Sequence, residues 1–243
     1  MPKGKYHLNV RPRLVGGLIV LLLLSAVPLA PAGPRKAKVP PDLAEILSRM
    51  DDAAKNLRTI SANLEYTKVT VVVDDKSTET GRLFFQKSKN PQILIDIRAP
   101  ESKTILFKKN KAEIFLPKIK QIQEYDLTSR SGLVQQFLLL GFGTQIDELK
   151  KNYDLKMLSE QELDGDTTVL LELVPTQANI AAQLDKVHLW ISEESWLPVQ
   201  QKFFQPGGDY LIAHYTSVKV NRRLPSSTFQ ISGAKDAKRV KMG

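Results

Sequence analysis

The 243-residue chain contains no cysteine. This absence excludes a disulfide framework, a thiolate zinc site, a cysteine nucleophile and a lipidated N-terminal cysteine. Histidine is scarce as well, with only His7, His188 and His214, and we expect His188 and His214 to be surface or hydrogen-bonded residues of strands. The sequence has no nucleophile elbow, phosphate-binding loop or metal-ligand spacing. It therefore predicts no enzyme activity, no cofactor and no metal site.

The chain has little net charge once its two ends are set aside. It contains 35 Lys and Arg against 26 Asp and Glu, a formal net charge of +9. Residues 1–32 hold four basic and no acidic residues, and residues 235–241 hold four basic and one acidic, which leaves +2 for the body. A nucleic-acid-binding domain normally has a basic face with interleaved aromatic side chains. We therefore expect no nucleic-acid partner.

Residues 1–32 have the pattern of a secretory signal peptide. Basic residues between Lys3 and Arg13 precede an apolar run, and Ala30-Pro31-Ala32 supplies the small residues that a signal peptidase needs. We expect cleavage after Ala32, because cleavage after Ala30 would leave a proline next to the scissile bond. An uncleaved anchor is the alternative, although the run is short of the roughly 20 residues of a membrane span. Export without cysteine predicts a periplasmic protein.

The remaining sequence predicts one domain, residues 42–232, between a linker at 33–41 and a basic tail at 233–243 that we expect to be disordered. Asp42 followed by Glu45 gives a capping-box-like start, and apolar residues at helical spacing from Leu43 to Leu57 predict an amphipathic helix. From Ile60 onward the pattern indicates about 11 antiparallel strands with short turns. The fold class is thus mainly β with helices.

A second helical segment at residues 133–142 is apolar on nearly every side, so it must be buried or contact an apolar surface. Several strands also have apolar side chains on both faces, including residues 83–85, 93–95 and 169–173. A sheet with one solvated face would alternate strictly. Two interpretations remain open: an ordinary sandwich core, or an apolar cavity that a curved sheet encloses and the 133–142 helix covers.

The order of these features resembles the periplasmic outer-membrane lipoprotein carriers, a LolA/LolB-like family of lipoprotein-sorting proteins. The resemblance covers most of residues 40–230 and rests on degenerate motifs: residues 57–66, residues 80–85, Lys89-Asn90-Pro91, residues 97–101 and Phe115-Leu116-Pro117. It implies a distant member with the family's fold, an open, unclosed antiparallel β-barrel of about 11 strands capped by a helical lid. It also implies that the cavity takes the acyl chains of a lipoprotein.

On this resemblance, alternate strand positions supply candidates for the cavity wall: Leu64, Tyr66, Leu83, Phe85, Ile95, Phe107, Phe115, Leu171, Leu189 and Ile191. The lid candidates are Leu133, Phe137, Leu140 and Phe142. A register error of one residue would exchange the wall candidates for the opposite face. The carriers hold their lid with an arginine directly before the proline of the turn after the second strand. Here Asn90 occupies that position, with Lys87 and Lys89 nearby.

The resemblance implies a monomeric periplasmic carrier that ferries lipoproteins from the inner to the outer membrane. It would receive them from an inner-membrane transporter complex and pass them to an outer-membrane receptor. One alternative keeps the fold and changes the cargo to a free lipid. Another is an envelope-stress regulator of the same fold, which binds a membrane-protein partner and transports nothing. Such regulators usually have a further C-terminal domain, for which we expect no room after about residue 230, and this favours carriage.

Overall fold

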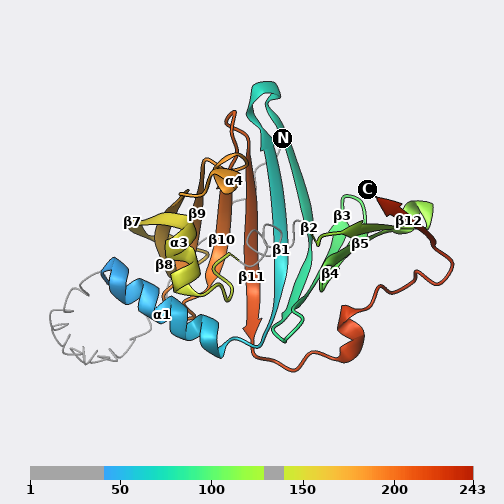
Figure 1. Ribbon diagram of the computed structural model, residues 1–243, viewed down its shortest axis with the longest axis horizontal. Helices are drawn as coiled ribbons and strands as arrows, with labels where there is room; N and C mark the ends of the chain where they lie inside the picture. The colour runs from blue at the N-terminus through green and yellow to red at the C-terminus, as the bar shows by residue number, and fades with distance from the viewer. Residues whose placement is uncertain (1–40, 129–139, 243) are drawn as a thin grey trace, which may run out of the picture. The chain divides into compact units, whose positions relative to one another are not determined.

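The computed structural model describes residues 41–128 and 140–242, which form a twelve-stranded sheet with short helices (Figure 1). The strands are β1 (Thr59–Thr70), β2 (Asp75–Gln86), β3 (Gln92–Ala99), β4 (Lys103–Lys108), β5 (Lys111–Leu116), β6 (Gln121–Asp126), β7 (Tyr153–Leu163), β8 (Asp166–Pro175), β9 (Lys186–Ser192), β10 (Pro198–Phe204), β11 (Tyr210–Val220) and β12 (Lys238–Met242). The helices are α1 (Leu43–Asn56), α3 (Ile146–Asn152) and α4 (Ala178–Ala181), with 3-10 turns η1 (Val71–Val73), η2 (Pro117–Ile119) and η3 (Ser226–Phe229).

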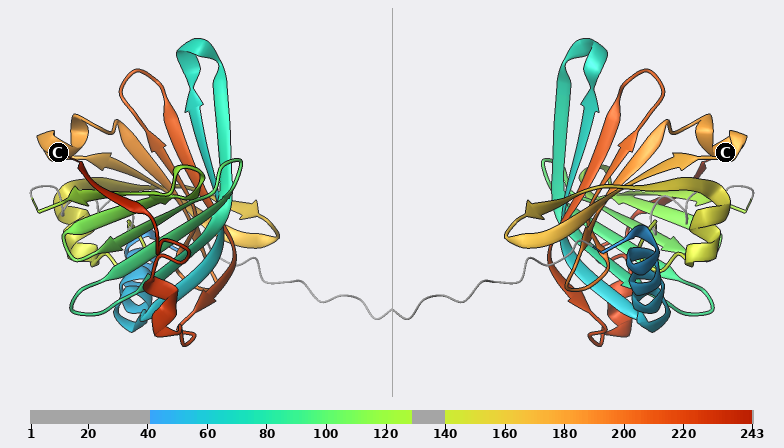
Figure 2. Two further views of the ribbon diagram at one scale, coloured as in Figure 1. Left: turned by 90° about the vertical axis from the view of Figure 1, so that its right-hand side faces the viewer. Right: turned by 90° about the vertical axis from the view of Figure 1, so that its left-hand side faces the viewer.

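The sheet does not close on itself. Its strand order is β12-β6-β5-β4-β3-β2-β1-β11-β10-β9-β8-β7, so β12 and β7 are its two edges. Every neighbouring pair is antiparallel except β12 and β6, which are parallel. Figure 2 shows the strong curvature of the sheet from the side. The predicted fold class, an open antiparallel barrel-like sheet with helices, is confirmed.

Helix α1 begins and packs as its sequence predicts. The Asp42 side chain accepts a hydrogen bond of 2.8 Å from the Glu45 backbone N–H, which satisfies one of the free donors at the first turn. The apolar stripe is buried, with Ile46, Leu47 and Met50 all at most 5% exposed. The helix therefore lies on the sheet through the face that the spacing of its apolar residues defines.

The basic tail contains a strand, so the expected disorder of residues 233–243 was wrong for Lys238–Met242. This segment pairs with Gln121–Tyr125 of β6. The Arg239 guanidinium forms ion pairs with Glu113 and Glu124, whose strands β5 and β6 lie beside it. The disorder was predicted from the many lysine and arginine residues of the tail. Composition does not show that a sheet edge and two carboxylates, all distant in sequence, are available to pair with the tail. The tail supplies the twelfth strand.

Several strands are apolar on both faces because both faces are covered. The inward side chains of β3, Ile93 and Ile95, belong to the concave core, whereas Leu94 packs on the outer face against Leu106 and Phe229. Partly buried residues of the segment after β11 extend this outer cluster. Residues 224–231 therefore cover part of the convex face, and this cover accounts for the broken alternation in β3 and β4.

The expected signal peptide, residues 33–40 of the expected linker and the lid candidates Leu133 and Phe137 lie outside the described residues. Within the described ranges, no helix is both long enough and apolar enough to cross a membrane.

Candidate functional site

A cavity of about 490 Å³ opens on the concave face of the sheet. Its wall comes from β1–β4, β10 and β11, with two residues that follow α4. The lining side chains are Leu64, Tyr66, Glu79, Leu83, Ile95, Ile97, Lys103, Ile105, Phe107, Gln183, Leu184, Gln201, Phe203, Gln205, Leu211, Ala213 and Tyr215. Most of them are aliphatic or aromatic.

Strand register brings these side chains onto one face. Leu83 lies opposite Ile95, and Ile95 lies opposite Ile105, so one row of aliphatic side chains crosses β2, β3 and β4. On the other side, Tyr66 lies opposite Ala213, which in turn lies opposite Gln201. Residues directly opposite in an antiparallel pair share a face, and period two keeps the wall continuous along each strand.

Gly81 marks the point where β2 begins to separate from β3. The register between the two strands shifts at Thr80 and Gly81. A Cβ atom added at Gly81 would lie 2.1 Å from the backbone oxygen of Asp96, so no other residue fits without displacing β3. Such a bulge bends the strand and increases its twist. Beyond this point the β1–β2 hairpin continues without β3 beside it.

The closed end of the cavity is buried, and its polar side chains Gln201 and Tyr215 are hydrogen-bonded to each other. The Gln201 side chain, 1% exposed, donates to the Leu140 backbone oxygen at 2.5 Å and accepts from the Tyr215 hydroxyl at 2.8 Å. The Tyr215 ring meets Phe142 edge-on, with ring centroids 5.0 Å apart. Burial raises the pKa of the Tyr215 hydroxyl well above its ordinary value, so it stays neutral.

The open end of the cavity is polar. The Lys103 ammonium donates to the Glu79 carboxylate at 2.6 Å, and both side chains are a little under one third exposed. Tyr66 lies beside this pair, and burial, followed by the Glu79 charge, raises the pKa of its hydroxyl. Gln183 and Gln205 complete the rim. An apolar interior with a charged rim suits an amphipathic ligand that buries a hydrocarbon chain and leaves a polar group in water.

The structure places five of the ten wall candidates in the cavity lining: Leu64, Tyr66, Leu83, Ile95 and Phe107. Phe85 faces the same way but is buried in the core below the cavity, and Phe115 is buried on β5 without lining it. Leu171, Leu189 and Ile191 also point inward, yet α1 and α3 fill the space in front of them. These three side chains have the predicted inward orientation, but the helices pack directly against them.

The described lid candidates are core residues at the closed end. Leu140 is fully buried and Phe142 is 2% exposed. Gly141 between them has φ of +82° and approaches the Pro198 side chain, so a tight turn follows Leu140. Leu133 and Phe137 lie outside the described residues. The predicted role of these four side chains as a lid stays a prediction.

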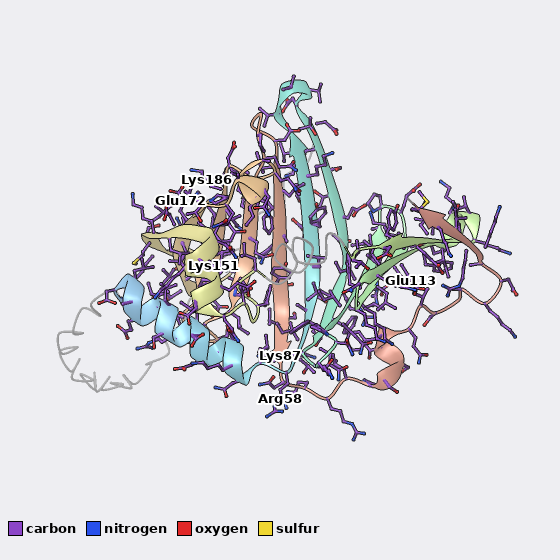
Figure 3. All side chains as sticks on the ribbon, in the orientation of Figure 1. Arg58, Lys87, Glu113, Lys151, Glu172 and Lys186 are labelled. Atoms are coloured by element: carbon purple, nitrogen blue, oxygen red, sulfur yellow. The ribbon has the colours of Figure 1, made fainter. Side chains whose placement is uncertain are left out.

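Lys87, and not Asn90, contacts a helix. Asn90 is exposed, and its backbone oxygen accepts a hydrogen bond of 2.6 Å from the Ser88 hydroxyl. The Lys87 ammonium instead donates to the Ala54 backbone oxygen near the C-terminal end of α1, at 2.8 Å. The Lys87 backbone N–H also donates to the Arg58 backbone oxygen at 2.7 Å. Figure 3 shows Lys87 and Arg58 at this end of the helix.

Sequence reasoning missed the second wall of the cavity, although a signal was present. Gln201 and Phe203 of β10 line it, as do Leu211, Ala213 and Tyr215 of β11. All five stand at alternate positions, which is the pattern of a strand with one inward face. The polar Gln201 made this face look solvent-exposed in the sequence. Its hydrogen-bond partners, Leu140 and Tyr215, are distant in sequence and could not be predicted from it.

The two strand histidines are hydrogen-bonded, as expected. His188 Nε2 lies 3.0 Å from Glu172 Oε2, and His214 Nε2 lies 2.6 Å from Asp164 Oδ2. Within residues 41–128 and 140–242, no group of three or more histidines and carboxylates gathers in a way that would hold a metal ion.

No protein-family model matches the chain, and no curated protein matches it. Several solved structures do match the chain. MucB in the MucA/MucB complex from Pseudomonas aeruginosa is 13% identical, with 81% of this chain and 63% of that chain covered and a TM-score of 0.50. An uncharacterized conserved protein from Thermus thermophilus is 13% identical over 82% and 98% of the two chains, with a TM-score of 0.53. A LolA superfamily protein from Nitrosomonas europaea is 16% identical over 77% and 97%, with a TM-score of 0.37.

The chain thus spans less than two thirds of the MucB chain that it matches. At identities of 13%, the likenesses to MucB and to the Thermus protein establish a shared fold. The chain shares the fold of these two proteins, which in this chain is an open, strongly curved and mainly antiparallel sheet with helices on its concave face.

Proposed function

We propose that this protein is a carrier that binds an acyl chain in the cavity and releases it again. The observation that supports this proposal is the cavity itself, with an apolar interior and the Glu79–Lys103 ion pair at its mouth. Its volume lies within the range of small-molecule sites. Burying a methylene group gains about 0.8 kcal/mol, so a chain of roughly 15 methylenes would gain on the order of 12 kcal/mol in a dry cavity.

We further propose that the cargo is the acyl chains of a lipoprotein, carried through the periplasm from the inner to the outer membrane. The sequence resemblance to the lipoprotein carriers supports this cargo over a free lipid. The protein would act by binding and release and not by catalysis. Its partners would be an inner-membrane transporter complex and an outer-membrane receptor.

A regulator that binds a protein partner is the second candidate. The likeness to MucB, which has been solved in complex with MucA, favours it. In that case the apolar faces serve mainly as core, and a partner binds elsewhere on the sheet. The two candidates differ in whether the cavity holds hydrocarbon.

The test is mass spectrometry of what co-purifies with residues 33–243 isolated gently from the native envelope. Triacylated peptides or intact lipoproteins would support the lipoprotein carrier, and free lipid alone would change the cargo. A bound protein without lipid, together with no binding of an apolar dye, would support the regulator.

A matched pair of variants assigns any lipid to the cavity. Ala213→Phe places a ring in the lining and is expected to abolish retention of the lipid. Ala44→Phe makes the same change at an exposed position of α1 and is expected to retain it. Equal retention by both variants would contradict binding in this cavity.

A further inference from the structure

The tip of the β1–β2 hairpin exposes three consecutive valines. Val71, Val72 and Val73 form η1 and are 51%, 84% and 68% exposed. Turn positions normally favour glycine, asparagine, aspartate and proline, and β-branched side chains gain nothing from exposure to water. None of the three hydrophobic clusters of the described residues includes these valines. Exposed apolar groups gathered in this way mark a surface that contacts something apolar.

The hairpin projects beyond the rest of the sheet. Pairing with β11 reaches no further than Val69, and pairing of β2 with β3 reaches no further than Thr80. From these points the two strands of the hairpin pair only with each other, up to Thr70 and Asp75. Figures 1 and 2 show the hairpin extending past its neighbours. The valines therefore reach a surface before other parts of this end of the sheet.

The projecting tip lies on the same side as the mouth of the cavity. Tyr66 and Glu79, which line the polar rim, are paired directly across the hairpin. Val71 is the fifth residue after Tyr66, which is about 17 Å along an extended strand. The buried part of the lining, such as Leu83 and Tyr215, lies farther from the tip. A flat apolar phase that touched the valines would face the open end of the cavity.

The chemistry of the tip favours a bilayer over a protein. Residues 68–76 contain no aromatic residue and no arginine, the types that supply most binding energy in protein interfaces. Lys68 and Lys76 offset Asp74 and Asp75, and Asp209 of the neighbouring turn adds one negative charge, so the tip has no basic patch or strong charge to direct a partner. Its backbone is partly satisfied, because the Asp74 N–H donates to the Val71 oxygen and the Val71 N–H donates to Asp209. That pairing lowers the cost of leaving water.

We propose that the Val71–Val73 tip inserts into the interfacial layer of a lipid bilayer and holds the mouth of the cavity against it. An acyl chain then moves between bilayer and cavity over a short path at the rim. This inference rests on the proposed function for its purpose, but insertion itself is measurable without any cargo. Because the tip has no excess of basic residues, insertion does not require anionic lipid and should depend little on salt.

The absence of cysteine allows a site-specific test. In residues 33–243, which include every residue of the three hydrophobic clusters, Val72→Cys is labelled with an NBD fluorophore. Ile119→Cys is the matched control, since Ile119 is 59% exposed at η2, a 3-10 turn that also precedes a left-handed residue. Vesicles of phosphatidylcholine, with and without phosphatidylglycerol, are then added. We expect the emission to rise and shift to the blue at position 72 and to change little at position 119.

Partitioning of unlabelled variants gives the second measurement. The triple change Val71→Ser, Val72→Ser and Val73→Ser is expected to weaken vesicle binding at least about tenfold. Ile119→Ser is expected to leave it unchanged, and both variants are expected to bind an apolar dye in the cavity as the unchanged protein does. Near-ultraviolet circular dichroism verifies that the variants are folded.

Each other outcome overturns one proposal and identifies which. Dye binding without vesicle binding, vesicle binding that survives the triple change, or equal loss in the Ile119→Ser control would overturn insertion of the tip and leave the cavity proposal standing. Vesicle binding through the tip without dye binding would overturn the cavity proposal and support insertion.

Discussion

The two halves of the concave face differ in what covers them. Across β7–β9, helices α1 and α3 pack on the inward side chains, and Val169, Leu171, Leu173 and Leu189 are completely buried. Across β1–β4 and β11, the inward side chains are just as apolar, yet a cavity remains in front of them. The inward positions of the strands are therefore similarly apolar in the sequences of the two halves. Helix placement, rather than strand composition, decides which half is core and which is available to a ligand.

The largest expected effect comes from truncation in the filled half. Leu171→Ala should lower the free energy of unfolding by about 2–5 kcal/mol, because the helices in front of it hold their positions and a void remains. Ile105→Ala, which enlarges an existing cavity, should cost less and should change the affinity for an apolar dye instead. Chemical denaturation and dye titration of both variants measure the contrast. Equal destabilisation would show that the open half is packed like the filled one.

Two tyrosines sharpen the comparison, because Tyr215 in the open half and Tyr153 in the filled half are both buried. Tyr215→Phe leaves the Oε1 atom of Gln201 without its donor and should cost about 1–3 kcal/mol of unfolding free energy. The Tyr153 hydroxyl has no hydrogen-bond partner among the described residues, and burial raises its pKa to about 12. Tyr153→Phe should therefore be neutral or stabilising. Thermal unfolding of the two variants checks the difference, and a loss on Tyr153→Phe as large as on Tyr215→Phe would contradict it.

Lys87 joins the two halves through its contact with α1. Lys87→Ala removes the hydrogen bond to the Ala54 oxygen and should cost about 1 kcal/mol, because the ammonium is near the surface. If this contact restrains α1, stopped-flow measurements should also show faster release of a cavity-bound dye. Lys89→Ala, two residues away and exposed, is the matched control and should change neither quantity. A normal release rate in Lys87→Ala would limit the residue to a structural role.

The smallest effect should come from the convex face behind the filled half. Hydrogen bonds from Lys186, and then from His188, lower the pKa of Glu172, and Figure 3 shows Glu172 and Lys186 close together. The folded state thus stabilises the ionised form of Glu172 relative to the protonated form. This contribution is present above the unfolded pKa and is lost as pH falls through the lower folded pKa. The unfolding free energy of Glu172→Gln should fall less than that of the unchanged protein between pH 5 and about pH 3. An equal fall of the unfolding free energy in both proteins over this pH range would contradict the prediction.

The strand pattern and the helix cap were readable from sequence because they depend on neighbours. Alternation assigned the inward face of Leu83 and Ile95 correctly, and Asp42 with Glu45 marked the start of α1. Which helices or segments cover each face of the sheet could not be predicted from the sequence. Leu189 and Ile95 occupy equivalent strand positions, and only α1 and α3, placed by tertiary packing, distinguish them. The same holds for Lys87. Its partner is the backbone oxygen of Ala54, 33 residues earlier, and a backbone oxygen has no signature in the sequence.

The parallel strand β12 has a consequence for the behaviour of the protein in concentrated solution. An open sheet presents unpaired backbone groups at its edges, and such edges can template association between molecules. Here one edge strand contains Lys238, Arg239 and Lys241 within five residues, and it covers the acidic β6. Two such edges repel each other when they approach. Strand β12 thus disfavours pairing of this edge with the same edge of a second molecule.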